Sequence, residues 1–226
     1  MNDDVSIGLI SGTGKEGRGI ALRLAATGVP VNLGSRSTDK ACQTARELNR
    51  QVGQERVRGM DNHTLVQQCK ILFLTVPFIH MDAVLREHLE EFSSHQVLVD
   101  VSVPVVFDKG PRLLQLSEGS GAEYLRKRIP SEIPLVAAFK TLPAQLLSQL
   151  NQSLDCDEFI SSDSAEAKEQ VRKVVERIPG LRWIDAGPLK YCRALEGMTF
   201  VAIGINRRFK IKSARFQVVG LEMAAR

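Results

Sequence analysis

The chain has 226 residues, of which 43% are apolar and 25% charged, and its formal net charge is +4. This length supports one substantial core, or a dinucleotide-sized domain with a smaller appendage, and the composition excludes a disordered or fibrous chain. No apolar run approaches the roughly 18 residues that a membrane-spanning helix needs, and the first residues lack the pattern of a signal peptide. We therefore expect a cytoplasmic protein without a membrane role.

Strands and helices alternate along the first half of the chain. Strands are predicted at 5–11, 30–36, 55–60, 70–77 and 96–106, and helices at 17–27, 37–51, 63–69 and 78–92. The strands are apolar without polar alternation, and helices separate them. This pattern predicts a Rossmann-type, doubly wound α/β fold with a parallel sheet covered on both faces.

The second half suggests a smaller unit. Residues 103–133 are less regular, and residues 134–144 read as a sixth strand that runs into a loop. Two further strands, at 157–162 and 181–187, flank a helix at 164–178, and a closing helix follows Pro188. We expect an NADP-binding domain over residues 1–149 and a small C-terminal α/β domain over 150–226 that closes a substrate cleft.

The four cysteines give no sign of a metal or redox centre. Cys42, Cys69, Cys156 and Cys192 are far apart in the sequence and form no C-x-x-C pair. We expect reduced structural thiols and no metal.

A glycine motif lies between the first predicted strand and helix. Gly12, Gly14 and Gly17 match G-x-G-x-x-G. In such a loop the first glycine permits a tight turn, the second lets the backbone approach a diphosphate, and the third allows close packing of the helix. The helix N-terminus then faces the anion with free N–H groups. An ordinary turn is the alternative, which the flanking strand and helix disfavour.

The residue at the end of the second strand indicates which dinucleotide is bound. An NAD site has Asp or Glu about 20 residues after the loop, where it binds the ribose 2′-hydroxyl. Here Arg36 stands nineteen residues after Gly17, preceded by Ser35 and followed by Lys40. A guanidinium binds a 2′-phosphate that a carboxylate would repel, so the sequence favours NADP over NAD.

Together these segments resemble the NADPH-dependent reductases of the deazaflavin coenzyme F420. The resemblance covers about residues 5–221 and rests on GTGKEGRGIALRLA, GSR with Lys40, LTVP followed by His80, SGAE, KTLPA, DAGPL and INRRFKIK. It implies a Rossmann domain and a small C-terminal domain, with the deazaflavin held between them. The glycine loop and GSR are shared with other NADP-binding proteins, whereas GLRWIDAGPL, which contains DAGPL, is more specific to this family and its close relatives.

The resemblance also implies the roles of individual residues. It places Thr13, Gly14, Lys15 and Glu16 on the NADP phosphates, and Ser35, Arg36 and Lys40 on the 2′-phosphate. It places Thr75, Pro77, Phe78 and His80 beside the adenosine or nicotinamide portion, and Val103, Pro104 and Ala144 at the nicotinamide ring. Gly187, Pro188 and Leu189 would face the deazaflavin. The chain departs from the family at Lys140, where a histidine is common, so a different flavin-like acceptor is left open.

Hydride transfer requires no nucleophile or acid–base group, because the protein only has to hold two rings with the reacting carbons about 3–3.5 Å apart. We accordingly predict no catalytic side chain. A basic segment that contains Arg207, Arg208, Lys210, Lys212 and Arg215 would attract the phosphodiester and glutamate tail of the deazaflavin. A merely solvated basic face is the alternative. No stacking motif for nucleic acid accompanies it.

Two other functions stay open. One is the NADPH-dependent reduction of a small imine or keto acid, and the other is a non-catalytic NADP-sensing protein. Related imine and keto acid reductases usually carry a long helical C-terminal domain, for which this chain is too short. Apolar residues near the C-terminus are compatible with a homodimer.

Overall fold

The computed structural model describes residues 6–221. Its strands are β1 (Ile7–Ile10), β2 (Val31–Ser35), β3 (Val57–Asp61), β4 (Ile71–Leu74), β5 (Val97–Asp100), β6 (Val105–Phe107), β7 (Pro111–Leu113), β8 (Leu135–Ala137), β9 (Cys156–Ser162) and β10 (Leu181–Gly187). Its α-helices are α1 (Lys15–Ala26), α2 (Thr38–Val52), α3 (Asn62–Gln68), α4 (Met81–His88), α5 (Gly121–Arg126), α6 (Ala144–Leu147), α7 (Ala165–Val175) and α8 (Cys192–Phe209). Single 3₁₀ turns lie at Phe78–His80, Leu89–Glu91 and Leu189–Tyr191.

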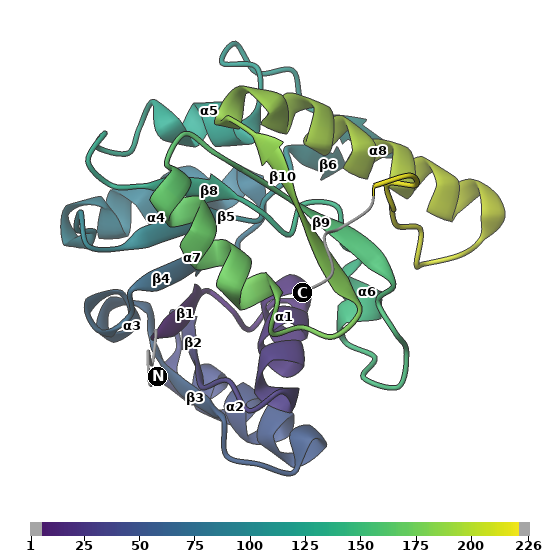
Figure 1. Cartoon of the computed structure of the whole chain (residues 1–226). Helices are drawn as coiled ribbons and strands as arrows, with labels where there is room; N and C mark the ends of the chain where they lie inside the picture. The colour runs from purple at the N-terminus through teal and green to yellow at the C-terminus, as the bar shows by residue number, and fades with distance from the viewer. Residues whose placement is uncertain (1–5, 222–226) are drawn as a thin grey trace.

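One large sheet organises the described chain (Figure 1), with the strand order β10-β9-β8-β5-β4-β1-β2-β3. The six strands from β8 to β3 pair in parallel. The chain leaves β1 through α1 to β2 on one side and later returns through α3 to β4 on the other side. The carboxyl ends of β1 and β4 therefore form a topological switch point, where open α/β sheets bind ligands. The predicted doubly wound fold is confirmed.

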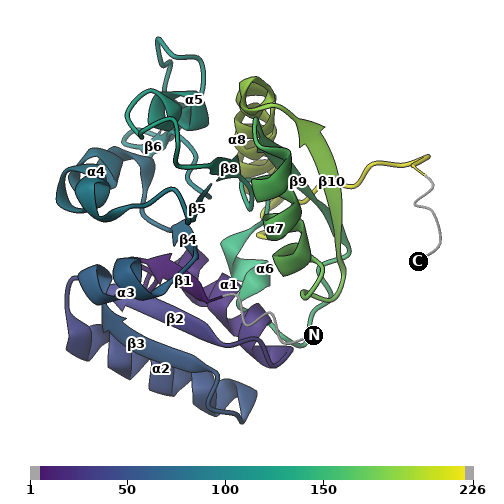
Figure 2. The ribbon, with the colours of Figure 1, turned by 60° about the vertical axis from the view of Figure 1, so that its left-hand side comes forward.

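Helices cover both faces of this sheet. One core contains apolar side chains from α1, α2, α6 and α7, and the other contains side chains from α3, α4 and α5. Figure 2 shows α2 and α3 on opposite faces of β2 and β3. Because both faces are buried, β1, β4 and β5 are buried at every residue, which explains why their sequences carry no charged side chain except Asp100 at the end of β5.

The strands predicted for a separate C-terminal unit extend the same sheet. β9 pairs with β8 in antiparallel fashion, with Val136 opposite Ser162, and β10 pairs in parallel with β9. The junction is tied to the first half by Arg23 of α1, which is 6% exposed. Its guanidinium donates to the backbone carbonyls of Leu146, Leu147, Gln149 and Gln152.

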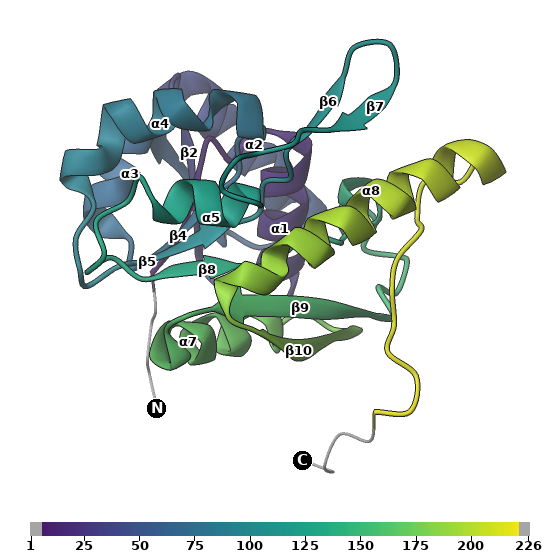
Figure 3. The ribbon, with the colours of Figure 1, turned by 90° about the horizontal axis from the view of Figure 1, so that it is seen from above.

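The structure differs from the sequence prediction between residues 101 and 147. β5 ends at Asp100, because its carboxylate accepts hydrogen bonds from the N–H and hydroxyl of Ser102 and turns the chain. The stretch predicted to be irregular contains α5 and the antiparallel hairpin β6–β7, which Figure 3 shows projecting from the body near α8. β8 has three residues, because Phe139 adopts a left-handed conformation (φ +57°) before the loop that leads to α6. No helix within residues 6–221 is long and apolar enough to cross a membrane.

Candidate dinucleotide and substrate site

The three motif glycines have different surroundings. A Cβ on Gly17 would lie 2.6 Å from the Cα of Gly12, and a Cβ on Gly12 would lie 2.8 Å from the Cβ of Leu9. Gly12 and Gly17 therefore let α1 pack directly against the turn after β1. Gly14 is exposed, and nothing lies within 4 Å of the position that its Cβ would take. This open position is where a ligand can approach the backbone.

The start of α1 is free of side-chain caps. Gly14 is its N-cap residue and makes no side-chain hydrogen bond, whereas Ser37, Asp61, Ser120 and Ser164 cap α2, α3, α5 and α7. The first N–H groups of a helix have no partner within the helix, and the helix dipole favours an anion beside them. An uncapped helix start beside an open glycine can thus hold a diphosphate.

The end of β2 supplies positive charge. Arg36 and Lys40 are exposed, and no hydrogen bond or ion pair joins either cationic group to another residue in 6–221. Ser35 is buried, and its hydroxyl accepts a hydrogen bond from the N–H of Ser37 at 3.2 Å. Opposite Ser35 lies Asp61 of β3, whose carboxylate accepts hydrogen bonds from the N–H and hydroxyl of Thr64, both at 2.8 Å. These bonds lower the pKa of Asp61.

The residues predicted for the nicotinamide side lie around the carboxyl ends of β4 and β5. Thr75 follows β4, and its hydroxyl donates to the carbonyl of Ile10 at 2.7 Å, which ties β4 to β1 at the switch point. Pro77 and His80 are exposed, Phe78, Val103 and Ala144 are half-buried, and Pro104 is buried.

Lys140 is buried among acceptors. It is 3% exposed, and its ammonium donates to Asp100 Oδ2 at 2.7 Å, to Glu196 Oε1 at 3.3 Å and to the carbonyl of Ser102. Burial alone would lower the pKa of Lys140, but the charges of Asp100 and Glu196 raise it above its ordinary value. Glu196 of α8 also accepts the N–H of Gly121 with both carboxylate oxygens, each at 3.0 Å. The Lys140 cluster thus connects β5, α5 and α8.

Two further carboxyl groups are buried, one in the glycine loop and one on β9, and the charges of Glu16 and Lys140 both act on Glu158. Glu158 of β9 is 0% exposed, and it accepts the N–H of Phe139. Glu16 is half-buried as a residue, but its Oε1 is fully covered. Burial raises the pKa of each to about 8, and the charge of Glu16 adds to the effect on Glu158. The sequence prediction missed Asp100, Glu158 and Glu196, because nothing in the local sequence marks them as buried.

The predicted substrate residues are dispersed. Leu189 is 3% exposed and packs in the second core, and its N–H donates to Asp163. Gly187 and Pro188 are half-buried. Arg207 is exposed near the end of α8, and its Nη1 would lie 3.3 Å from a Cβ on Gly110 of the β6–β7 turn.

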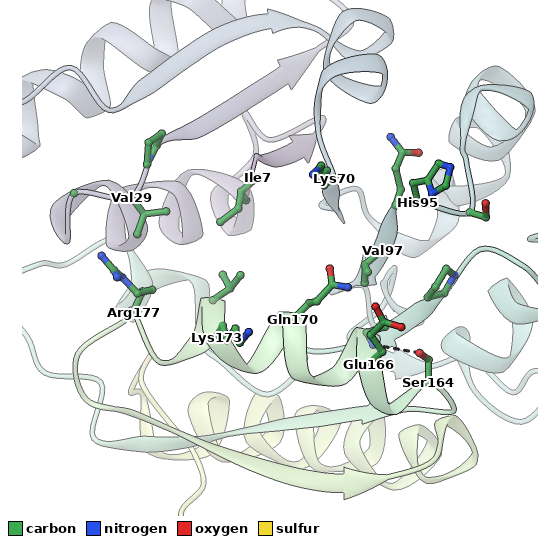
Figure 4. A pocket seen from close by; sticks show the side chains of 17 residues that line it. Ile7, Val29, Lys70, His95, Val97, Ser164, Glu166, Gln170, Lys173 and Arg177 are labelled. Carbon is green, nitrogen blue, oxygen red and sulfur yellow. Dashed lines mark hydrogen bonds between the residues drawn. The ribbon is translucent and has the colours of Figure 1, made fainter. Parts of the chain in front are cut away.

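A cavity of about 1080 Å³ lies at the amino ends of the strands, on the side of the sheet opposite the glycine loop. Figure 4 shows Glu166, Gln170 and Lys173 of α7, and Arg177 just after this helix, on one side of the cavity. Residues at or before the starts of β1, β4 and β5 lie on the other side. Because it lies at the amino ends of the strands, this cavity is separate from the glycine loop. The residues in 6–221 contain no His, Cys, Asp or Glu cluster that could hold a metal ion, and the four cysteines are free thiols.

Known proteins match nearly the whole length of this chain. The family model described as "NADP oxidoreductase coenzyme F420-dependent" matches residues 6–104. The F420-dependent NADP reductase of Methanocaldococcus jannaschii is 30% identical, with 97% of this chain and all of the relative aligned. The reductase of the same name from Methanothermobacter thermautotrophicus is also 30% identical, over 96% of both chains.

Among solved structures, a candidate F420-dependent NADP reductase from Arthrobacter sp. FB24 superposes with a TM-score of 0.80 at 22% identity, and it covers 95% of this chain and 99% of its own. That likeness bears on the fold, whereas the sequence relatives extend along both halves of the chain. The chain therefore belongs to the family of coenzyme F420-dependent NADP oxidoreductases.

Proposed function

We propose that this protein is an oxidoreductase that binds NADP(H) at the glycine loop and transfers a hydride between it and a deazaflavin of the coenzyme F420 type. The observation that carries the proposal is the pairing of an uncapped, open glycine turn with an unpaired arginine at the end of the neighbouring strand. The family relatives, which are named for F420 and NADP, support the same assignment.

In this proposal the diphosphate and the 2′-phosphate of NADP bind at different places along the carboxyl ends of the strands. The diphosphate is held by the backbone of residues 12–17, where the glycines leave room and the helix start supplies N–H groups. The 2′-phosphate is held by Arg36 and Lys40, with Ser35 at the strand end. Because a guanidinium offers a planar pair of donors, Arg36 makes the stronger and more directional contact.

The nicotinamide side is assigned to the carboxyl ends of β4 and β5. Thr75 fixes these strands through its bond to Ile10, and Pro77, Phe78, His80, Val103, Pro104 and Ala144 remain predicted neighbours of the ring. When both are bound, the nicotinamide and the deazaflavin would exchange a hydride directly between their rings. The protein's task is to orient both molecules and exclude water, so it needs no acid or base at the reacting atoms.

Burial reduces the set of residues that can contact the substrate directly. The ammonium of Lys140 is already bonded to three protein oxygens, and the side chain of Leu189 lies in the core. We therefore assign Lys140 a structural role: it holds Ser102 and α8 in place beside the substrate site and does not contact the substrate itself. Gly187, Pro188 and Arg207 stay candidates for direct contact with the deazaflavin. The same proposal assigns NADP binding to residues 1–149 and closure of the substrate cleft to residues 150–226, although both parts share one sheet.

A homodimer through α8 is the proposed assembly. Val201 is 54% and Phe209 65% exposed, and Ile205 between them is also exposed, so one apolar stripe with a spacing of four residues faces outward. Neither nucleic acid nor a membrane is a proposed partner, and the cytoplasm is the proposed location.

The function is tested by mixing the protein with NADPH and oxidised deazaflavin and following the absorbance of the nicotinamide. We expect the absorbance to fall only when both compounds are present. NADPH binding without loss of absorbance would favour the sensing function. Turnover of an imine or keto acid, with none of the deazaflavin, would favour the other reductase activity.

A further inference from the structure

The glycine loop begins with a strained residue. Ser11 lies between β1 and Gly12, and its φ of +56° is in the left-handed region. Serine rarely adopts this conformation without support, whereas glycine does so readily. The direction of the chain into Gly12 therefore depends on whatever holds Ser11 in place.

Asn62 is the residue that contacts it. The amide oxygen of Asn62 accepts the N–H of Ser11 at 3.0 Å, and its nitrogen lies 3.4 Å from the Ser11 hydroxyl. Asn62 is 4% exposed and is the first residue of α3. Its backbone is fixed on one side by β3 and on the other by the α3 turn that Asp61 caps through Thr64.

The same side chain touches the strand that leads to Arg36. A Cβ on Gly34 would lie 2.5 Å from Asn62 Oδ1, so the amide fills the space that a side chain at position 34 would need. Gly34 is followed by Ser35 and Arg36. Asn62 thus lies between the entry of the glycine loop and the end of β2.

We propose that Asn62 is a positioning residue for the dinucleotide. It holds Ser11 in the left-handed conformation and thereby aligns the phosphate-binding backbone of residues 12–17 with the strand end that carries Arg36. This inference rests on the proposed function. Because Asn62 is buried and both ends of its amide face Ser11, it acts through the loop and not by touching the ligand.

The test compares Asn62→Ala, Ser11→Gly and the double variant, by titration with NADPH and with NADH. Asn62→Ala should weaken binding of both nucleotides about tenfold, since both share the diphosphate, a change equivalent to about 1.4 kcal/mol. Adding Ser11→Gly should restore at least half of the lost binding energy, because glycine adopts positive φ without support. Absence of rescue, or a loss confined to NADPH, would overturn the inference.

A buried asparagine elsewhere provides the matched control. Asn49 of α2 is also 4% exposed, and its amide bonds Arg56, Val57 and Glu55. Asn49→Ala should lower the melting temperature, but Ser11→Gly should not compensate for it.

Hydrogen exchange of the ligand-free protein separates this inference from the proposed function. Amides of residues 11–17 should exchange at least about tenfold faster in Asn62→Ala than in the parent protein, and at the parent rate in Asn49→Ala. If the parent protein failed to bind NADPH, the proposed function would fall, while the exchange result would still decide whether Asn62 holds the loop. Unchanged exchange in Asn62→Ala would overturn that role.

Discussion

Arg36 and Lys140 both follow strands of the same sheet, yet their surroundings are opposite. Arg36 comes directly after β2, is exposed, and has no ion pair with any residue in 6–221. Lys140 comes three residues after β8, is 3% exposed, and bonds Asp100, Glu196 and the carbonyl of Ser102. The first cation is available to a ligand, and the second is already occupied by the protein.

Arg36 and Lys140 show that cations after strands of one sheet can serve two purposes: one is free to bind a ligand, and the other stabilises the fold. Removing a buried partner leaves unpaired charges in a medium of low polarity, whereas removing an exposed charge changes little in the fold. Loss of Lys140 should therefore appear mainly in stability, and loss of Arg36 mainly in nucleotide binding.

The largest expected effect is on stability. Lys140→Met should lower the free energy of unfolding by about 3–5 kcal/mol, because it leaves Asp100 and Glu196 buried without their cation. Urea unfolding measures this change. Arg36→Met is the control, and it should change the free energy of unfolding by less than about 0.5 kcal/mol.

Neutralising the carboxylates should restore part of the stability. Adding Asp100→Asn and Glu196→Gln to Lys140→Met removes the unpaired charges while nearly keeping their shapes. Equal costs for Lys140→Met and Arg36→Met would contradict the buried position of Lys140.

The next effect is on nucleotide selectivity. Arg36→Glu should raise the dissociation constant of NADPH about 100-fold, or about 2.7 kcal/mol, because a bidentate contact with the 2′-phosphate becomes a repulsion. NADH has no 2′-phosphate, so its binding should change less than about threefold. Fluorescence titration with both nucleotides measures the ratio.

The cavity at the amino edge of the sheet supplies a matched control. Lys173→Glu makes the same change in net charge, but Lys173 lines the cavity on α7, at the edge opposite the glycine loop. It should leave both dissociation constants within about twofold. If Arg36→Glu weakened NADPH and NADH binding equally, Arg36 would not be the residue that binds the 2′-phosphate.

The surroundings of Arg36 could be predicted from the sequence better than those of Lys140. The glycine spacing, the apolar strands and Arg36 are local patterns, and they predicted the α/β fold and the position of the loop. The partners of Lys140 are 40 and 56 residues away in the sequence, so no local pattern could reveal that it is buried. The same holds for Asn62, whose contact with Ser11 joins positions 51 residues apart.

The local sequence also could not show that β9 and β10 join the main sheet. The residues 157–162 and 181–187 were correctly predicted to be strands, but whether they joined the first sheet depended on the antiparallel pairing of β8 with β9. β8 has only three residues, and the left-handed turn at Phe139 ends the extended segment that the apolar sequence would have continued.

The smallest expected effect, about 1.4 kcal/mol per pH unit, concerns Glu158 of β9. It accepts the N–H of Phe139, next to Lys140, and its pKa is raised to about 8, first by burial and then by the charge of Glu16 in the glycine loop. The native protein thus keeps a proton that the unfolded chain releases near pH 4.3. Between these pH values the unfolded form binds fewer protons, so the free energy of unfolding falls as the pH rises.

Glu158→Gln should remove this contribution. A glutamine keeps an oxygen to accept the Phe139 N–H but does not titrate, so stability should fall less steeply with pH, by about 1.4 kcal/mol per pH unit between pH 5 and 8. Urea unfolding at several pH values gives the slopes, with the exposed Glu166→Gln as the control that keeps the parent slope. Equal slopes for Glu158→Gln and the parent protein would mean that Glu158 is ionised in the fold. The excess negative charge would then extend from the Lys140 cluster toward the glycine loop, where it would oppose the binding of a diphosphate.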